Sequence, residues 1–361
     1  MNVFGSLIEN ALKNADTTSQ SHNEVVGHAN IKVIGCGGGG TNATNWLFKK
    51  GVQGAEIMAI NTDKQHLDLV EADRKLLIGR DLTRGLGCGG FPEKGREAAK
   101  EQLGELKEML RGADMVFIAA GMGGGTGTGC APVVAAIAKE EKAIVIGAVT
   151  MPFEIERARI EKAEYGLQQL RDVCDTVIVI DNNRLVKIAG NLPIQQAFAV
   201  ANELVSTMIK GIVEIIAVPS LVNLDYADVK AIMSNGDVSV VGIGESDSQN
   251  RVEEAVRRAL SNPLLEVSYE GASGALIHVS GGDDLTLDEV NKVGNMLTML
   301  TEALDEDANV IWGARISSDM KGKLRVMAII TGVTSPYIMG KGAKRKDNSK
   351  HMSNNLGIDF V

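Results

Sequence analysis

The chain has few cysteines and no long stretch of uncharged apolar residues. Its 361 residues include four cysteines, none at C-x-x-C spacing, each in an apolar or glycine-rich segment. This usage argues against a disulfide framework or a zinc site and favours a reducing cytosol. No uncharged apolar run approaches the roughly 20 residues that span a bilayer, and the N-terminus lacks the pattern of a signal peptide. We therefore expect no direct membrane span.

Positive charge is also in the minority. Lysine and arginine number 37 against 46 aspartates and glutamates, a formal net charge of -9. Because general nucleic-acid binding needs a basic surface that replaces counterions, the sequence predicts no nucleic-acid partner. The 44% hydrophobic content is typical of a globular protein, and the length allows two domains.

Apolar strands alternate with helical patterns from residue 31 to about residue 180. The strands are continuous apolar runs, as expected where helices cover both faces of a sheet. Helical patterns at 94–111 and 156–173 lie between them. We therefore predict an α/β domain with a doubly wound parallel sheet over 30–192, in which ligands bind at the carboxyl ends of the strands. The strands are expected at 31–34, 56–61, 115–120, 143–150 and 176–180.

A long helical pattern over 193–219 follows this domain. It is apolar nearly all round, which indicates a central helix buried between two bodies. The next segment, 220–335, predicts a smaller α/β C-terminal domain. Its strands are expected at 238–243, 275–279, 310–316 and 324–331, and its helices at 251–260 and 287–304.

The two ends of the chain differ from these domains. Residues 1–29 predict a short amphipathic helix and a linker, and docking on its own domain is favoured over contact with a partner or membrane. Residues 336–361 predict a flexible basic tail that ends in the apolar segment Leu356–Val361. An apolar end after a linker predicts a docking peptide for a partner, although a tail that folds back on its own domain is the alternative.

The first glycine-rich loop is Gly35–Asn42, between the first strand and a helix. Glycines let the backbone approach a phosphate, and the helix start adds partial positive charge. Gly35, Gly37 and Gly40 satisfy G-x-G-x-x-G, and Asp63 follows the second strand, as in dinucleotide-binding folds. Alone, this loop would predict an oxidoreductase of the NAD type.

The second loop, Gly121–Gly129, follows the strand at 115–120. Pro132 is expected to open the next helix, and the hydroxyls of Thr126 and Thr128 could donate to phosphate oxygens. One such loop serves a dinucleotide, whereas two converging loops suit a triphosphate. The sequence has no G-x-x-x-x-G-K-[ST] motif, which excludes a P-loop protein.

The run Gly-Gly-Gly-Thr-Gly-Thr-Gly at 123–129 resembles the signature of the tubulin/FtsZ superfamily of GTPases, in the order found in FtsZ. The resemblance covers about residues 30–333. It implies the tubulin/FtsZ fold, with a GTP-binding domain, a central helix and a C-terminal GTPase-activating domain. The implied function is a cell-division GTPase of the cytoplasm that forms head-to-tail protofilaments of the mid-cell division ring. Other matching segments are Asn61–Asp63, Thr83–Gly87, Ala113–Ala120 and Asn223–Val229.

The resemblance also implies contacts with GTP or GDP. The ribose contacts fall on Glu156 and Arg159, and the base contacts on Asn182 and Asn202, with Phe198 stacking on guanine. Residue types alone do not choose guanine over adenine. Mg²⁺ is expected on the phosphates, with no metal site of the protein's own. The expected phosphate contacts are Gly38, Gly39, Gly40, Thr41, Asn42, Gly89, Gly90, Gly125, Thr126, Gly127 and Thr128.

The implied catalytic residues are Asn223, Asp225 and Asp228, which follow the central helix. Taken alone, Asp225 would be a helix cap, but the family uses these acids to position the attacking water. Because they lie at the opposite end from the phosphate loops, we expect them to reach a neighbour's nucleotide in a filament of this same chain. A filament that binds GTP without turnover is the alternative. The terminal Gly357–Asp359 resembles the tail of archaeal FtsZ proteins where the membrane anchor SepF docks.

Overall fold

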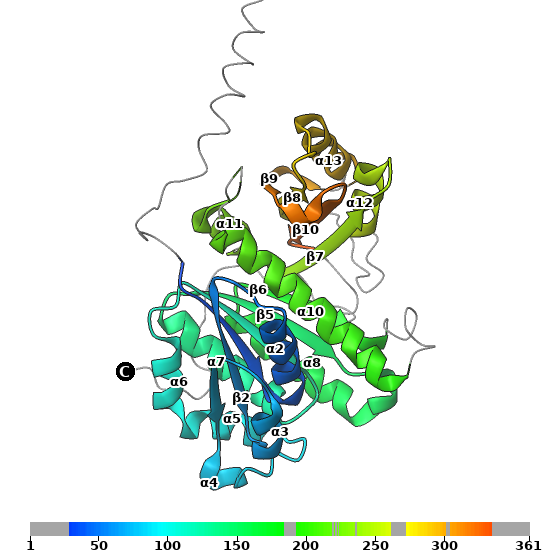
Figure 1. Ribbon diagram of the computed structural model, residues 1–361. Helices are drawn as coiled ribbons and strands as arrows, with labels where there is room; N and C mark the ends of the chain where they lie inside the picture. Colours follow the sequence, from blue (N-terminus) through cyan, green and yellow to red (C-terminus); the bar gives the residue numbers. More distant parts are fainter. Residues whose placement is uncertain are drawn as a thin grey trace, which may run out of the picture.

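The structure is a computed structural model that describes residues 29–183, 193–218, 220, 222, 224–234, 237–260, 272–300 and 304–333. The expected N-terminal helix within 1–29 and the tail 336–361 therefore lie outside the described residues, apart from Ala29. Ten strands form one sheet in the order β3-β2-β1-β4-β5-β6-β7-β10-β8-β9. Figure 1 shows the two halves of this sheet as two layered bodies, with the long helix α10 running between them.

The first six strands are parallel, and helices cover both of their faces. Successive residues of one strand enter two different cores: Val33 and Phe117 pack toward α10, whereas Ile34 and Ile118 pack toward α7. This confirms the doubly wound parallel sheet. The strands are β1 (Ile31–Cys36), β2 (Ala55–Asn61), β3 (Arg74–Leu77), β4 (Met115–Gly121), β5 (Ile144–Met151) and β6 (Thr176–Asp181).

Two predicted helices are interrupted. The pattern over 94–111 forms two helices that meet at Gln102, whose side-chain oxygen accepts a hydrogen bond from the Gly79 backbone (2.5 Å). The pattern over 156–173 begins as the 3-10 helix η1 (Glu154–Arg159) before α8 (Ile160–Val173). The other helices here are α2 (Gly37–Lys49), α3 (Lys64–Leu69), α4 (Arg80–Thr83), α5 (Pro92–Glu101), α6 (Leu103–Leu110) and α7 (Thr126–Glu140).

The helix α7 begins earlier than predicted. Pro132 lies inside it rather than in its first turn, so that prediction was wrong. The small residues from Thr126 to Gly129 are already helical, and Gly129 N–H donates to the Gly125 carbonyl (3.1 Å). The end of the second glycine loop is therefore the first turn of the helix itself.

The central helix α10 (Ile194–Ala217) joins the two bodies. Val205, Met208 and Ile212 lie in a core shared with Phe117 of β4 and Ile329 of β10. This confirms the buried position that its apolar sequence predicted. No helix in the described part of the chain is long and apolar enough to cross a membrane.

The second body completes the sheet. Strand β7 continues from β6 through parallel pairing of Thr176 with Asp237, and the Thr176 and Ser239 hydroxyls lie 2.6 Å apart in the interior. The two domains thus share one sheet. The elements are α11 (Tyr226–Met233), β7 (Asp237–Ser246), α12 (Arg251–Leu260), β8 (Ala272–Gly281), α13 (Leu287–Leu300), β9 (Leu304–Ile316), η2 (Ser318–Met320) and β10 (Leu324–Thr331).

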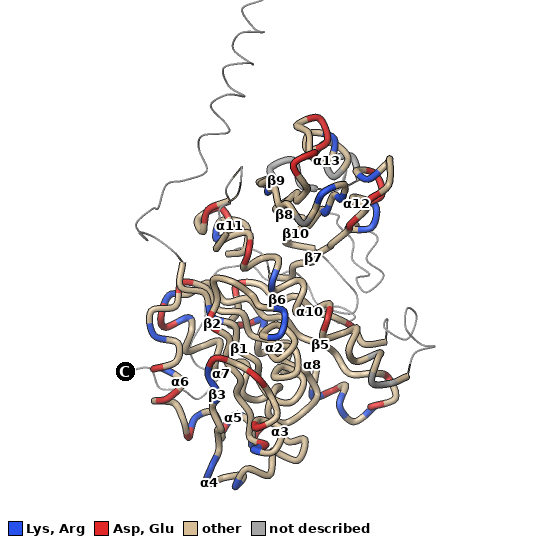
Figure 2. The backbone as a smooth tube through the Cα atoms, viewed as in Figure 1, with Lys and Arg blue, Asp and Glu red and all other residues tan. Residues whose placement is uncertain are grey.

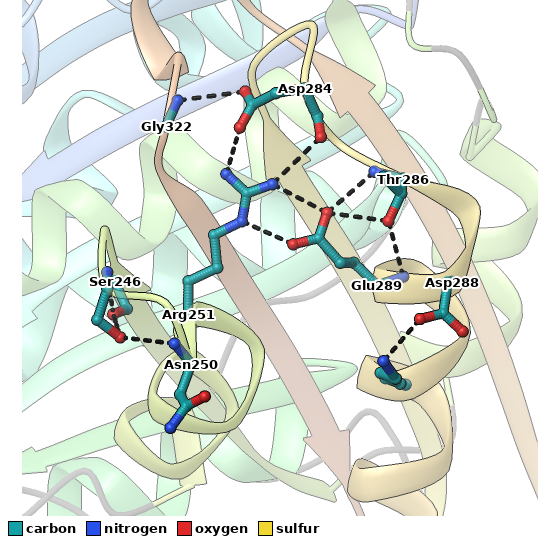
Figure 3. Close-up of polar contacts among 10 residues, drawn as sticks. Ser246, Asn250, Arg251, Asp284, Thr286, Asp288, Glu289 and Gly322 are labelled. Carbon is teal, nitrogen blue, oxygen red and sulfur yellow. Dashed lines mark hydrogen bonds and ion pairs between the residues drawn. The ribbon is translucent and has the colours of Figure 1, made fainter.

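One arginine ties the outer helices of this body together (Figure 3). The Arg251 guanidinium, on α12, donates to Glu289 of α13 (2.7 Å) and to Asp284 before it (2.6 Å). Asp284 also accepts from the backbone of Gly322 in the β9–β10 connection (3.2 Å). Hydrogen bonds from Arg251 hold the pKa of both carboxyl groups below their usual values. The Arg251 and Glu289 side chains are 11% and 19% exposed, whereas Asp284 is 40% exposed, so only the pair of Arg251 with Glu289 is largely shielded from water.

Candidate functional site

The first glycine loop lies where β1 turns into α2. Gly37 has a φ of +69°, and a Cβ at Gly40 would lie 2.1 Å from the Ala119 carbonyl oxygen, so both positions require glycine. Gly38, Gly39 and Asn42 are exposed. No side chain caps the start of α2, which leaves its first N–H groups available to an anion.

The second loop meets the first in direct backbone contact. A Cβ at Gly37 would lie 2.6 Å from the backbone nitrogen of Gly127, and a Cβ at Gly127 would lie 3.0 Å from the Cys36 carbonyl oxygen. The start of α7 after Gly125 also has no side-chain cap. Two uncapped helix starts therefore converge at the carboxyl ends of β1 and β4, where an open sheet binds its ligand.

The threonines of these loops are buried and engaged within the protein. Thr41 Oγ1 donates to the Gly37 carbonyl (2.8 Å), and the Thr126 and Thr62 hydroxyls lie 2.7 Å apart. Thr128 Oγ1 accepts from the Gly123 N–H (2.9 Å). In this arrangement the hydroxyls hold the conformation of the loops. Gly38 and Gly39 of the first loop are exposed, whereas Gly125 and Gly127 of the second loop are buried. Contact of these three side chains with phosphate stays a prediction.

The third loop, Cys88–Phe91, packs on the second. Phe91 N–H donates to the Cys88 carbonyl (3.2 Å), and the central Gly89 and Gly90 have φ values of +60° and +79°. Two positive φ angles are characteristic of a type I′ turn. A Cβ at Gly125 would lie 2.6 Å from Cys88 Cβ, so the structure brings Gly89 and Gly90 beside the second loop, and their contact with phosphate stays a prediction.

The predicted ribose residues lie at the other flank of the second loop. Arg159 donates to the Glu156 carboxylate (2.6 Å), which also accepts from the backbone of Phe153 (3.0 Å). A Cβ at Gly123, where φ is +90°, would lie 2.8 Å from Arg159 Cβ. The structure therefore places Glu156 and Arg159 together beside this loop.

The predicted base residues come from β6 and α10. Asn182 follows β6, is 8% exposed, and its Oδ1 has no hydrogen-bond partner within the described residues. A buried acceptor without a partner is costly, and a nucleobase N–H would satisfy it. Phe198 is 43% exposed and meets Phe153 edge to face at 5.6 Å between ring centroids. Asn202 lies one helical turn after Phe198 on α10.

The acidic pair lies at the start of α11. Asp225 Oδ1 accepts from the Asp228 N–H (2.8 Å), and Asp228 Oδ2 accepts from the Asp225 N–H (3.1 Å). This reciprocal pairing is a capping box, so the interpretation of Asp225 as a helix cap is confirmed. Asp225 is exposed, and Asn223 lies outside the described residues. Figure 2 marks acidic residues in red along α11.

The acidic pair and the phosphate loops lie at opposite ends of the strands. The loops lie at the carboxyl ends, and the acidic pair lies near the amino end of β4. Tyr226, next to Asp225, donates its hydroxyl to the carbonyl of Asp114 (2.7 Å), directly before β4. The second loop begins at the other end of this strand, and seven residues of β-strand span about 20 Å. Figure 1 shows α11 at the end of the domain away from α3 and α4, which follow the carboxyl ends of β2 and β3.

Two residues of the loop region were not predicted. His66 Nδ1 lies 3.3 Å from Thr41 Oγ1 and 3.3 Å from Asn61 Nδ2. Lys162 donates to the Gly90 carbonyl (2.7 Å) from 72 positions away. Neither side chain belongs to a glycine-rich motif, and the separation along the chain leaves no local pattern that could have revealed them.

The comparisons with known proteins agree with this geometry. Residues 30–190 match the model of the tubulin/FtsZ family GTPase domain, and residues 237–334 match that of the FtsZ family C-terminal domain. A protein named cell division protein FtsZ 2 from Methanocaldococcus jannaschii is 55% identical, over 99% of this chain and 97% of its own length. One of the same name from Halobacterium salinarum is 50% identical, over 95% and 88%.

The solved structures give the same assignment. A structure described as an empty FtsZ dimer from M. jannaschii superposes with a TM-score of 0.80 at 43% identity, over 98% of this chain and 99% of that one. A second structure, of a mutant FtsZ from the same organism, has a TM-score of 0.80 at 46% identity, over 91% and 96%. The chain therefore belongs to the FtsZ branch of the tubulin/FtsZ family of GTPases.

Proposed function

We propose that this chain is a cell-division GTPase whose active site is completed only by assembly. One subunit binds GTP in its glycine loops, and Asp225 and Asp228 of a neighbour stacked head to tail act on that nucleotide. The observation that supports this is the separation of about 20 Å, estimated from the length of β4, between the two halves of the site within one chain. The resulting filaments would form the cytoplasmic division ring.

Each half of the site has a defined chemical task. The uncapped starts of α2 and α7 stabilise the phosphate charge through backbone N–H groups. The capping box uses one oxygen of each carboxylate, Asp225 Oδ1 and Asp228 Oδ2. The second oxygen of each is left to orient a water for attack on the terminal phosphate, and such positioning is the main requirement of phosphoryl transfer.

We also propose that Mg²⁺ accompanies the nucleotide and is held mainly by phosphate oxygens. Within the described ranges there is no group of three or more His, Cys, Asp or Glu side chains that could hold a metal ion. The proposal is supported by the chemistry of nucleotide triphosphates, whose oxygens are the ligands that Mg²⁺ prefers. When bound, Mg²⁺ neutralises charge on the phosphate oxygens.

The tail supplies a further proposed contact. Gly357–Asp359 would bind a membrane anchor similar to SepF, which would attach the filaments to the membrane. This proposal is supported by the resemblance of these residues to archaeal FtsZ tails, since they lie outside the described part of the chain.

The test of the shared site measures phosphate release against protein concentration. We expect the rate per subunit to rise steeply with concentration and filaments to sediment in GTP. Asp225→Ala should bind GTP normally and lose turnover. Mixing it with a binding-defective Asn182→Ala/Phe198→Ala double variant, which keeps intact acids, should restore phosphate release at mixed junctions.

Several results would contradict the proposal. A rate per subunit that stays constant with concentration, or no recovery in the mixture, would argue for a site within one chain. Filaments without phosphate release would support a purely structural protein. Nicotinamide fluorescence on NADH binding would support the oxidoreductase that the first loop alone suggested.

A further inference from the structure

A lysine outside the predicted site holds the third glycine loop from α8. The half-buried Lys162 donates its ammonium to the Gly90 carbonyl at 2.7 Å. The same ammonium lies 5.3 Å from the ring centroid of Phe91, within the range of a cation–π contact. One side chain thus contacts two successive residues of the loop.

The loop needs such a contact because sterics do not fix it. Gly89 and Gly90 stand side by side, and a Cβ at Gly90 would meet no atom within 4 Å. Two adjacent glycines can change conformation at little cost. The peptide unit between Gly90 and Phe91 is held at both ends: its N–H donates to Cys88 (3.2 Å), and its carbonyl accepts from Lys162. Without Lys162, one of these two restraints is lost.

The loop also has donors to offer. Within the described part of the chain, the N–H groups of Gly89 and Gly90 make no hydrogen bond. The loop packs on Gly125, at the start of the uncapped helix α7. Unpaired N–H groups beside a helix start form a site for an anion.

We propose that Lys162 is a positioning residue for the terminal phosphate of GTP, and this rests on the proposed function. By fixing the peptide unit after Gly90, Lys162 keeps the Gly89 and Gly90 N–H groups directed at the γ-phosphate. GDP lacks that phosphate, so Lys162 contributes to GTP affinity and not to GDP affinity. The residue therefore makes the site selective for the triphosphate.

The experiment measures GTP and GDP affinity by calorimetric titration of the full chain with EDTA present, which prevents turnover. A hydrogen bond from a charged group predicts about a tenfold loss of GTP affinity in Lys162→Met, with GDP affinity within about twofold. Lys94→Met is the matched control, because Lys94 is also 5.3 Å from the Phe91 ring but makes no hydrogen bond to the loop. Lys162→Arg, which keeps a cationic donor, should recover most of the loss.

Three outcomes would overturn the inference. Equal losses for GTP and GDP would show a general structural role, and unchanged GTP affinity in Lys162→Met would show none. An equal effect of Lys94→Met would assign the change to the ring contact. Thermal unfolding confirms that each variant is folded. If the wild-type chain bound neither nucleotide, the proposed function would fail as well. If the wild-type chain bound and hydrolysed GTP normally and Lys162→Met had the same affinities, only the inference about Lys162 would be wrong.

Discussion

The two ends of the strands in the shared sheet are built in different ways. At the carboxyl ends of the strands, glycine backbones lie very close to neighbouring segments. A single Cβ at Gly37, Gly40 or Gly127 would collide with another loop or with strand β4. At the amino ends of the strands, Asp225 and Asp228 lie at the start of α11 and are hydrogen-bonded to each other. The proposed nucleotide site is thus built into the interior packing of one chain. The proposed hydrolytic groups lie at the surface, where substitutions are expected to leave the fold intact.

The strongest test of this contrast is Gly40→Ala. The added methyl would lie 2.1 Å from the Ala119 carbonyl oxygen, so the first loop must move away from β4. We expect GTP affinity to fall by more than about a hundredfold, with a loss of stability typical of overpacking, about 1–3 kcal/mol. Calorimetric titration and thermal unfolding measure both. Gly104→Ala is the control, since a Cβ there meets no atom within 4 Å, and normal GTP binding by Gly40→Ala would refute the close-packing argument.

The second test separates the helix-capping role of Asp225 from its proposed role in hydrolysis. Asparagine caps helices about as well as aspartate, so Asp225→Asn should change the free energy of unfolding by less than about 0.5 kcal/mol. Turnover should still fall by about a hundredfold, because the amide lacks the negative charge that orients water. Denaturant unfolding and phosphate release provide the two measurements. Full activity in Asp225→Asn would leave this residue with a capping role alone.

The smallest expected effect concerns the C-terminal body, where Arg251 and its two carboxylate partners join the helices α12 and α13. Arg251→Met leaves the largely covered Glu289 carboxylate without its partner, and for the loss of this pair we expect a destabilisation of about 2 kcal/mol in thermal unfolding at neutral pH. The pKa values of Asp284 and Glu289 are lowered in the folded chain. Their contribution is therefore present above the unfolded values near pH 4 and lost as the pH falls through the folded ones.

The difference between wild type and Arg251→Met should consequently shrink in acid. Unfolding temperatures measured from about pH 7 down to about pH 3 test this, because that range spans the unfolded carboxyl values. A difference that does not depend on pH would mean that the Arg251 side chain contributes through packing alone.

Local patterns predicted the parallel strands and the glycine loops well. The buried strands β1 and β4 are apolar throughout because both faces are covered, and this leaves a continuous signal in the sequence. The short edge strand β3 was missed, since two of its four residues are exposed and charged. Helix boundaries were misplaced at Gln102 and Pro132. The Gln102 side-chain oxygen accepts a hydrogen bond from the Gly79 backbone at the first boundary, and the residues before Pro132 are already helical at the second.

The sequence by itself determined which backbone can approach a phosphate, because a glycine requirement is a property of one position and its neighbours. Only the tertiary structure decided that the loops converge, that Lys162 reaches Gly90 across 72 residues, and that Asp225 lies at the far end of β4. These are relations between distant segments, created by packing. The residue types at Asp225 and Asp228 suit both a helix cap and a catalytic pair. Their position at the amino end of β4, away from the glycine loops, is why the proposed catalytic role requires a neighbouring subunit.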